Sequence, residues 1–354
     1  MSTALAARLA AITPVDDRLA PTAQAHLDDL TKPRGSLGRL EELALRLYVI
    51  GRGAPPAVDP ARIFTVAGDH GVVAEGVSIA SSEVTRQMIA NFLAGGAGIN
   101  VLARRNDIEL LVVDAGVAGG PFPEHPSLIQ AKIAPGTANI ARCPAMSRED
   151  CVKALNLGFS LAERSAAEGI RCLGTGDMGI GNTTPSTALY CAFLGLDPVE
   201  ITGPGAGLDA AGVARKAKVV ARALAANQAA VASGDPLTIL AALGGYEIAT
   251  LAGLVLGAAA RGLPVAVDGF ISTAATLCAL RLCPAAAGYV VYSHASAETG
   301  FARIAQAMGI QPLLPLGLRL GEGTGSALAI HLLRCAAAIF NEMATFSAAG
   351  VNKD

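Results

Sequence analysis

Six short apolar runs recur along the chain, and each is followed by small, polar or acidic residues. They comprise residues 63–66, 110–113, 170–173, 264–267, 289–292 and 312–316. Apart from Thr65 and Arg171 the runs are apolar rather than alternating, which is typical of strands in a parallel sheet that is covered on both faces. Helical patterns separate the runs, as the crossovers of a parallel sheet require. The pattern therefore predicts an α/β fold with a doubly wound, mainly parallel six-stranded sheet and helices on both faces.

Both ends of the chain show helical patterns instead. Leu40, Leu43 and Leu47 recur at helical spacing, and the Gly-Ala-Pro-Pro segment at 53–56 then breaks the pattern. Residues 326–344 form another long pattern rich in alanine and leucine, which is expected to pack with the N-terminal helices. We therefore expect a small helical domain from residues 1–58 and 326–354, and an α/β (Rossmann-like) catalytic domain from residues 59–325.

The stretch 238–260 is long and apolar enough to imitate a membrane span, and Glu247 is its only charge. The carboxylate, the Gly244-Gly245 pair and the dominance of alanine over leucine all make insertion into hydrocarbon less favourable. A buried core helix is the preferred interpretation, and we expect no membrane partner.

Composition narrows the class of protein further. The 354 residues are 52% hydrophobic and 16% charged, so the chain buries a large core and is not disordered. The 27 lysines and arginines are balanced by 29 acids without a long basic run, so a nucleic-acid partner is not expected. The seven cysteines include no C-x-x-C pair and lie mostly in apolar surroundings. Together with the lack of a secretory signal pattern, they predict reduced thiols and a cytoplasmic location.

Two glycine-rich segments are candidate anion sites. Residues 174–185 (Gly-Thr-Gly-Asp-Met-Gly-Ile-Gly-Asn-Thr-Thr-Pro) follow an apolar run, and their glycines let the backbone approach a phosphate that Thr183 and a helix N-terminus can bind. The alternative is a tight connection without a ligand, since the P-loop lysine and the dinucleotide spacing are lacking. Residues 202–209 precede a helix that carries Lys216, which either completes the anion site or belongs to a solvated helix face.

Glu322 stands between Gly321 and Gly323 at the start of the last helical pattern. It is either a base whose pKa an apolar pocket raises, or an acid that stabilises a helix N-terminus. His294 is in the same way either catalytic or structural. Acids and a histidine also follow several runs, which raises a metal hypothesis, but no metal-ligand spacing supports it. Turn stabilisation is the preferred role of these residues, and we expect no metal or cofactor. The acids and the histidine concerned are Asp69, His70, Asp114, Asp177 and Asp268.

Ordered motifs nearly from end to end resemble one enzyme family. They lie at residues 31–40, 68–72, 75–78, 84–88, 179–184, 243–248, 268–270, 293–294 and 321–325. In these segments the chain is similar to the nicotinate-nucleotide:dimethylbenzimidazole phosphoribosyltransferases of the cobalamin lower-ligand pathway. The resemblance implies a homodimer that transfers 5-phosphoribose from nicotinate mononucleotide to 5,6-dimethylbenzimidazole, giving α-ribazole 5′-phosphate and nicotinate. It implies no metal.

The resemblance also suggests roles for individual residues. Glu322 matches the family's catalytic carboxylate, which takes the N–H proton of the benzimidazole. The residues expected to bind the nucleotide and its phosphate are Gly176, Asp177, Gly181, Asn182, Thr183, Gly203, Lys216 and Ser293. Ser81, Gln87 and Met178 are expected near the benzimidazole. Asp177 departs from the family, which often has glutamate there. Two other functions stay open, a non-catalytic nucleotide sensor and a Mg²⁺-dependent phosphosugar enzyme.

Overall fold

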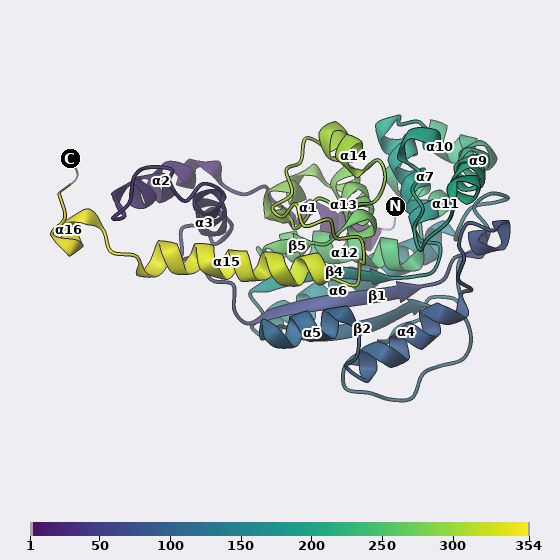
Figure 1. Ribbon diagram of the computed structural model, residues 1–354, viewed down its shortest axis with the longest axis horizontal. Helices are drawn as coiled ribbons and strands as arrows, with labels where there is room; N and C mark the ends of the chain where they lie inside the picture. The colour runs from purple at the N-terminus through teal and green to yellow at the C-terminus, as the bar shows by residue number, and fades with distance from the viewer. Residues whose placement is uncertain (1–2, 353–354) are drawn as a thin grey trace.

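The computed structural model describes residues 3–352 (Figure 1). Six strands alternate with helices along the chain. The strands are β1 (Ala61–Gly68), β2 (Glu109–Gly116), β3 (Leu128–Gln130), β4 (Cys172–Met178), β5 (Val265–Val267) and β6 (Val290–Tyr292). The helices are α1 (Thr3–Ala10), α2 (Ala20–Asp29), α3 (Arg39–Ile50), α4 (Glu83–Leu93), α5 (Gly98–Arg105), α6 (Arg148–Ala167), α7 (Thr183–Leu194), α8 (Pro198–Ile201), α9 (Ala210–Ala226), α10 (Gln228–Ala232), α11 (Pro236–Leu243), α12 (Tyr246–Ala260), α13 (Phe270–Leu282), α14 (Phe301–Met308), α15 (Thr324–Glu342) and α16 (Phe346–Ala349). Three 3₁₀ helices, Asp17–Leu19, Gly71–Glu75 and Pro284–Tyr289, complete the fold.

The six strands form one parallel sheet in the order β3-β2-β1-β4-β5-β6, which confirms the predicted fold class. Five of the six predicted runs lie in β1, β2, β4, β5 and β6. The sixth prediction, at 312–316, is wrong: the segment makes only a single bridge between Leu314 and His294. Pro312 and Pro315 lack the amide protons that a ladder needs. The strand that the pattern missed is β3, an edge strand of three residues, which is too short to show a period.

Helices cover both faces of the sheet because the strands bury apolar side chains on both sides. Phe64 and Val66 belong to one core, which they share with α6, α7, α12 and α13. Ile63 and Ala67, which alternate with them on β1, belong to a second core with α4, α5 and α15. The sheet is therefore the middle layer of three. Because helices cover both of its faces, a ligand site can form only at the edge where the strands end.

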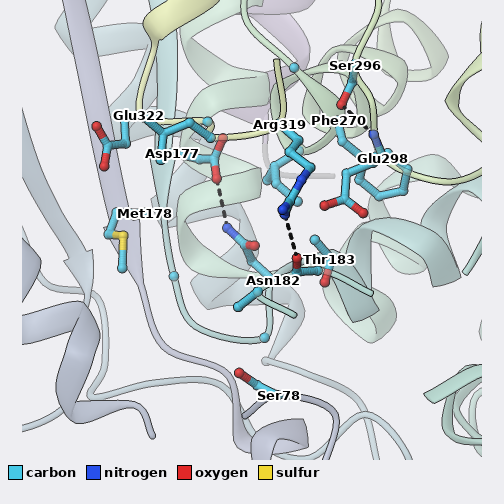
Figure 2. Close-up of a pocket in the computed structure, with 18 of the residues that line it drawn as sticks. Ser78, Asp177, Met178, Asn182, Thr183, Phe270, Ser296, Glu298, Arg319 and Glu322 are labelled. Atoms are coloured by element: carbon cyan, nitrogen blue, oxygen red, sulfur yellow. Dashed lines mark hydrogen bonds between the residues drawn. The ribbon is translucent and has the colours of Figure 1, made fainter. Parts of the chain in front are cut away.

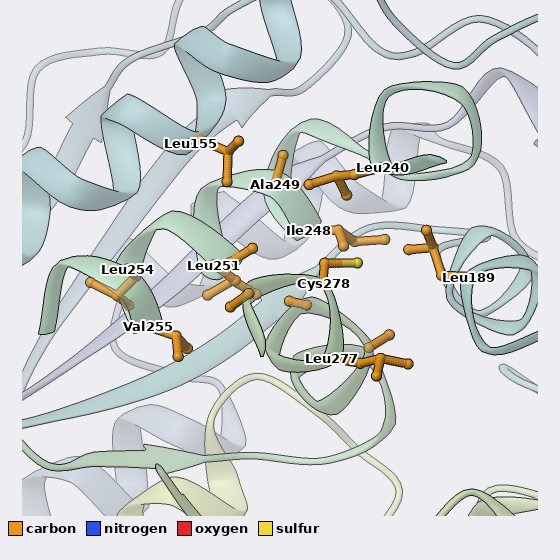
Figure 3. Close-up of a cluster of buried hydrophobic side chains, with 14 of the residues drawn as sticks. Leu155, Leu189, Leu240, Ile248, Ala249, Leu251, Leu254, Val255, Leu277 and Cys278 are labelled. Atoms are coloured by element: carbon orange, nitrogen blue, oxygen red, sulfur yellow. The ribbon is translucent and has the colours of Figure 1, made fainter. Parts of the chain in front are cut away.

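Glycine lets α6 and α12 pack unusually close together. A Cβ atom on Gly158 of α6 would lie 2.0 Å from the carbonyl oxygen of Thr250, and one on Gly253 of α12 would lie 2.0 Å from that of Leu155. Leu155 and Leu251 fill the core beside this contact (Figure 3). The chain's many small residues are thus explained in part by backbone contact between helices, where larger side chains would not fit.

The apolar stretch 238–260 is two helices rather than one. Gly244 and Gly245 separate α11 from α12, so the expectation of a single helix is wrong, while its burial in the core is confirmed. Glu247 lies in the first turn of α12 and is fully buried. Among the described residues, only α15 is long and apolar enough to cross a bilayer. Because 56% of its most apolar window is buried inside the protein, α15 also fits the core helix of a non-membrane protein, and it is weak evidence for a span.

A helical lobe extends from one end of the sheet (Figure 1). It contains α2, α3 and the outer half of α15, where Phe340 contacts the rings of His26 and Tyr48 with centroids 4.4 and 5.3 Å apart. Helix α1 lies elsewhere, against α6, where Arg8 bonds Asn156 and Glu163. The domain limits at 58 and 326 stay a prediction, and residues 1–2 and 353–354 lie outside the described part. Helix α15 itself joins the lobe to the edge of the sheet.

Candidate functional site

A cavity of about 340 Å³ opens at the carboxyl edge of the sheet, a size at the lower end of ordinary small-molecule sites. It lies where β1 and β4 pair and where the chain leaves them in opposite directions, so the connections diverge and leave space. The lining residues fall within segments 77–78, 177–183, 205–206, 269–271, 294–298 and 319–322, with Met88. The cavity therefore combines the connections after β1, β4, β5 and β6 with the turn before α15.

Glu322 occupies a strained turn at this edge. Gly321, Glu322 and Gly323 have φ angles of 78°, 65° and 102°, three consecutive left-handed conformations. A residue other than glycine in this region costs about 1–2 kcal/mol. The turn is held by the Glu322 amide, which donates to the Asp177 carbonyl at 3.2 Å, and by the Thr65 hydroxyl, which donates to the Glu322 carbonyl at 2.7 Å. The strain is typical of a functional position.

Glu322 is 4% exposed as a whole residue yet lines the cavity. Burial raises its pKa above the ordinary value for glutamate; the Ile99 amide, which donates to Oε2 at 3.3 Å, lowers it, and the negative charge of Asp268 raises it. A carboxylate whose pKa is moved toward neutrality is a better base than an ordinary one. Glu322 therefore presents a carboxyl group of raised pKa at the wall of the cavity.

Asp177 lies between Glu322 and the glycine-rich loop. Its Oδ2 accepts a hydrogen bond from Asn182 Nδ2 at 2.9 Å, while its buried Oδ1 has no partner within the described residues. Burial raises its pKa well above the usual value, and the charge of Asp268 adds to this against the Asn182 bond. An oxygen without a partner at a cavity wall is available to a ligand, so the structure is compatible with the predicted binding role of Asp177.

The far end of the cavity carries hydroxyl and cationic groups. Thr183 begins α7, whose N-terminus favours anions. Its Oγ1 accepts a hydrogen bond from Lys216 Nζ at 2.5 Å, and Nζ also donates to the Gly203 carbonyl at 3.3 Å. Arg319 donates to the Gly205 carbonyl at 3.2 Å and is the one arginine or lysine among the described residues that line the cavity. These groups suit a phosphate.

Lys216 is nearly inaccessible, with 1% of its surface exposed. Burial lowers its pKa to about 8, against a smaller opposing effect of Glu298. The lysine does not itself line the cavity; it lies behind Thr183 and orients that hydroxyl. Its charge therefore acts at the cavity through Thr183 and through space in a medium that screens poorly.

Figure 2 shows how the two ends are separated. Glu322 and Met178 lie together on one side of the cavity, and Arg319, Glu298 and Thr183 lie on the other. Asp177 and its bond to Asn182 stand between them. One end thus offers a base beside an apolar side chain, and the other offers anion-binding groups, so the cavity matches a molecule with an apolar ring and a phosphate.

The structure brings together some of the residues predicted from sequence and separates others. Those that line the cavity are Asp177, Met178, Gly181, Asn182, Thr183 and Glu322. Those that lie behind its wall are Gly176, Gly203, Lys216 and Ser293. Ser81 and Gln87 are exposed near the start and middle of α4, outside the cavity lining, although the neighbouring Met88 belongs to it. The roles given to all of these residues remain predictions.

Two of the residues predicted to bind the nucleotide also have structural roles. Gly176 lies in β4 beneath the Glu322 turn, where a Cβ atom would lie 2.2 Å from the Glu322 carbonyl oxygen. Ser293 is fully buried and donates to the main-chain carbonyl of Asp268 at 3.0 Å. Both residues therefore shape the walls from which Glu322 and Asp268 project.

Sequence reasoning missed Arg319 as a cavity residue. The signal for it was a single charge within the apolar segment Leu316 to Leu320, just after the run expected as a strand at 312–316. It also left Asp268 as a simple turn residue, whereas the Asp268 carboxylate accepts the amides of Gly323 and Gly325, on either side of the start of α15. Contacts between residues more than fifty positions apart give no local pattern.

A second buried pair lies below the cavity floor. His70 Nε2 and Glu247 Oε1 are 2.7 Å apart, and both side chains are almost fully buried. A Cβ atom on Gly245 would lie 2.4 Å from the His70 ring, so glycine makes room for this pair. Within the described residues, no group of three His, Cys, Asp or Glu side chains is arranged to hold a metal ion.

The close approach at Gly176 gives a first testable prediction. Gly176→Ala is expected to lower the free energy of unfolding by about 1–3 kcal/mol, because the added methyl group overlaps the Glu322 carbonyl. Gly120→Ala is the matched control, since a Cβ atom there meets nothing within 4 Å. Urea unfolding measures both. Equal stability of the two variants would show that the Glu322 turn moves freely away from β4.

Comparisons with known proteins agree on one family. A family model described as phosphoribosyltransferase matches residues 12–351. The nicotinate-nucleotide:dimethylbenzimidazole phosphoribosyltransferase of Solidesulfovibrio magneticus is 66% identical over 353 residues, covering 100% of both chains. The enzyme of the same name from Chlorobaculum tepidum is 49% identical over 344 residues, covering 97% of each chain. A crystal structure of CobT from Thermus thermophilus superposes with a TM-score of 0.89 at 44% identity, covering 95% of this chain and 100% of that one.

Proposed function

The chain belongs to the family of nicotinate-nucleotide:dimethylbenzimidazole phosphoribosyltransferases, and we propose that its cavity performs this transfer with Glu322 as the base. The reaction moves 5-phosphoribose from nicotinate mononucleotide to 5,6-dimethylbenzimidazole and yields α-ribazole 5′-phosphate and nicotinate. The observation that carries the assignment of residues is the Glu322 turn. It presents a carboxylate of raised pKa at the apolar end of a cavity whose other end binds anions.

The leaving group needs little help in this reaction. The glycosidic nitrogen of nicotinate mononucleotide is part of a pyridinium ring, so the electron pair of the breaking C1′–N bond neutralises that ring and no general acid is required. The acceptor needs more help, because its attacking nitrogen becomes cationic unless the N–H proton on the other nitrogen is removed. Glu322 accepts that proton as the new N–C1′ bond forms. Attack opposite the departing nicotinate converts the β-linkage to the α-linkage.

Positioning supplies the rest of the rate enhancement. Thr183 and the N-terminus of α7 face the nucleotide phosphate, with Arg319 beside them and Lys216 behind. Asp177 lies midway between the phosphate end and Glu322, where the ribose is expected. Met178 and Met88 line the end at which the neutral benzimidazole is expected, and burial of its ring there needs no charge. The roles of Asp177, Gly181 and Asn182 follow from this placement.

The test of the proposed function is product analysis. The purified protein, incubated with nicotinate mononucleotide and dimethylbenzimidazole in buffer containing a chelator, is expected to form α-ribazole 5′-phosphate and nicotinate in equal amounts. A nucleotide sensor would bind the mononucleotide without forming either product. A Mg²⁺-dependent phosphosugar enzyme would form product only after Mg²⁺ was added. Either of those outcomes would refute the proposal.

We also propose a homodimer in the cytoplasm. Exposed apolar side chains support a dimer contact: Val101, Leu316 and Leu320 are each more than half exposed, and Leu320 also lines the cavity. Such exposure is typical of surfaces that a partner covers. The cysteines support a reducing compartment, because all seven are free and five are buried. Burial also raises the pKa of the Cys172 and Cys191 thiols to about 12, which keeps them unreactive.

A further inference from the structure

Asp268 is a buried aspartate beside the cavity, and each of its two carboxylate oxygens accepts a hydrogen bond. It follows β5, is 1% exposed and is not itself a lining residue. Its backbone is fixed from two neighbouring strand ends: its amide donates to Thr175 Oγ1 at 3.0 Å, and its carbonyl accepts from Ser293 Oγ at 3.0 Å. A carboxylate held this firmly at the end of a strand is able to position whatever it binds.

The groups that Asp268 binds are the amides of the Glu322 turn. Asp268 Oδ2 accepts from the Gly323 amide at 2.9 Å, and Oδ1 accepts from the Gly325 amide at 2.7 Å. These amides belong to the N-terminus of α15, whose own N-cap residue is Gly323 and therefore has no side chain to cap the helix. Asp268 replaces that missing cap from a position 55 residues away in sequence.

The capped helix begins two residues after Glu322, so the cap also fixes the strained turn. Without it, the turn keeps the two bonds of the Glu322 backbone to Asp177 and Thr65 and the bonds from Thr324 to the Gly321 carbonyl, but it loses its anchor to β5. A side chain that must meet a substrate N–H group tolerates little displacement, since an error of about 1 Å costs about a hundredfold in rate. The cap therefore controls where the Glu322 carboxylate lies.

We propose that Asp268 is the positioning residue of the transferase: through the amides of Gly323 and Gly325 it clamps the end of the Gly321–Gly323 turn to the first turn of α15, and so fixes the Glu322 carboxylate at the cavity. The proposal rests on the proposed function only for the role of Glu322 as base. Asp268 touches no substrate. Burial is the main cause of the raised pKa of Glu322, and the negative charge of Asp268 adds to it.

Several other groups face this region and contribute to its titration. Asp177 approaches from β4, and Glu247 of α12 acts on Asp177 in turn. The Ile99 amide at the start of α5 binds Glu322 directly. His294, after β6, places Nε2 3.6 Å from Asp268 Oδ1. Because the charge of Asp268 raises the pKa of both Glu322 and Asp177, its removal is expected to lower both, and the acidic limb moves to lower pH whichever of the two carboxylates sets it.

The test is Asp268→Asn in the full chain, with Asp114→Asn as the matched control. The asparagine keeps the size but loses the charge and one of the two amide bonds. The expected result is a kcat about ten- to a hundredfold lower, a KM for nicotinate mononucleotide within about twofold, and an acidic limb of the pH profile shifted to lower pH. Asp114 is also a buried aspartate near a strand end, and it accepts the Val117 amide at 2.9 Å, but it does not contact the turn. The control is expected to keep the wild-type limb.

Hydrogen exchange separates this proposal from the function itself. In Asp268→Asn the amides of Gly323 and Gly325 are expected to exchange at least about tenfold faster than in wild type, whatever reaction the protein performs. Unchanged exchange, or an unchanged kcat with an unmoved acidic limb, would overturn the proposal. A raised KM with normal kcat would also overturn it, by making Asp268 a binding residue.

A second variant keeps the test decisive if Asp268→Asn does not fold. Ser293→Ala removes the hydroxyl that holds the Asp268 carbonyl and leaves the carboxylate in place. It is expected to lower kcat and loosen the same two amides, by smaller factors. A rise in KM for the nucleotide without a change in exchange would assign Ser293 to nucleotide binding and count against the clamp.

Discussion

Replacing Glu322 with glutamine is expected to slow turnover by about a hundredfold or more while leaving the affinity for nicotinate mononucleotide within about twofold, because only the base is removed. Glutamine has the same shape and its amide oxygen can still accept the Ile99 amide. The left-handed turn and its bonds to Thr65 and Asp177 involve only the backbone of residue 322. Steady-state kinetics and equilibrium binding of the nucleotide measure the two effects separately.

The role of Glu322 as a base also predicts how activity changes with pH. Glu322 acts when deprotonated, and burial together with the Asp268 charge raises its pKa. Wild-type activity is therefore expected to fall as the pH is lowered through that raised pKa, at a higher pH than an ordinary glutamate would titrate. In Glu322→Gln this limb is expected to vanish. In Glu298→Gln, which alters a carboxylate at the other end of the cavity, the limb is expected to stay.

Two results would contradict the assignment of Glu322. Turnover of Glu322→Gln close to wild type would remove the base, and an acidic limb that persists unchanged in the variant would assign the limb to another group. Asp177 is the first candidate for that group, because its pKa is also raised and its Oδ1 has no partner within the described residues. Asp177→Asn, measured over the same pH range, distinguishes the two carboxylates.

The fold was predictable from sequence because strands that are buried on both faces carry apolar residues that point in both directions. In β1, Phe64 and Val66 enter one core while Ile63 and Ala67 enter the other, which a half-exposed strand does not require. The pattern failed where local composition and backbone geometry disagree. Pro312 and Pro315 prevent a ladder in an apolar segment, and β3 is paired without an apolar run of its own. Gly244 and Gly245 broke a helix whose apolar pattern continues on both sides.

The candidate site was predictable where its residues share one loop. Asp177, Asn182 and Thr183 belong to a single glycine-rich segment, and the structure places all three at the cavity. The position of Lys216 behind Thr183 was not predictable, because it depends on how α9 packs against α7. The clamp from Asp268 to Gly325 joins β5 to α15, and only the folded sheet brings these residues within 2.7 Å. Motifs locate loops, whereas the tertiary contacts decide which side chain reaches the ligand.

Replacing Lys216 with methionine is expected to weaken the binding of nicotinate mononucleotide about ten- to a hundredfold and to leave the KM for dimethylbenzimidazole nearly unchanged. Lys216 acts on the phosphate through its charge-assisted bond to Thr183, of a kind that contributes about 1.5–3 kcal/mol, and through space, whereas the neutral benzimidazole makes no use of a buried cation. Methionine keeps the apolar stem of the side chain but loses the bond from Nζ to Thr183. Isothermal titration with the nucleotide measures the loss. Lys218→Met is the matched control, because Lys218 lies exposed on the same helix.

The buried position of Lys216 makes this effect depend on pH in a defined direction. Burial lowers the pKa of Lys216 to about 8, so wild-type affinity for the nucleotide is expected to fall as the pH rises through about 8 and the ammonium loses its proton. The methionine variant has no such charge and is expected to bind weakly and equally on both sides of this pH. Nicotinate riboside, which lacks the phosphate, is expected to be handled alike by variant and wild type. An equal loss of affinity for riboside and nucleotide would show that Lys216 supports the fold or the sugar site, and the phosphate would then depend on Arg319 and the N-terminus of α7.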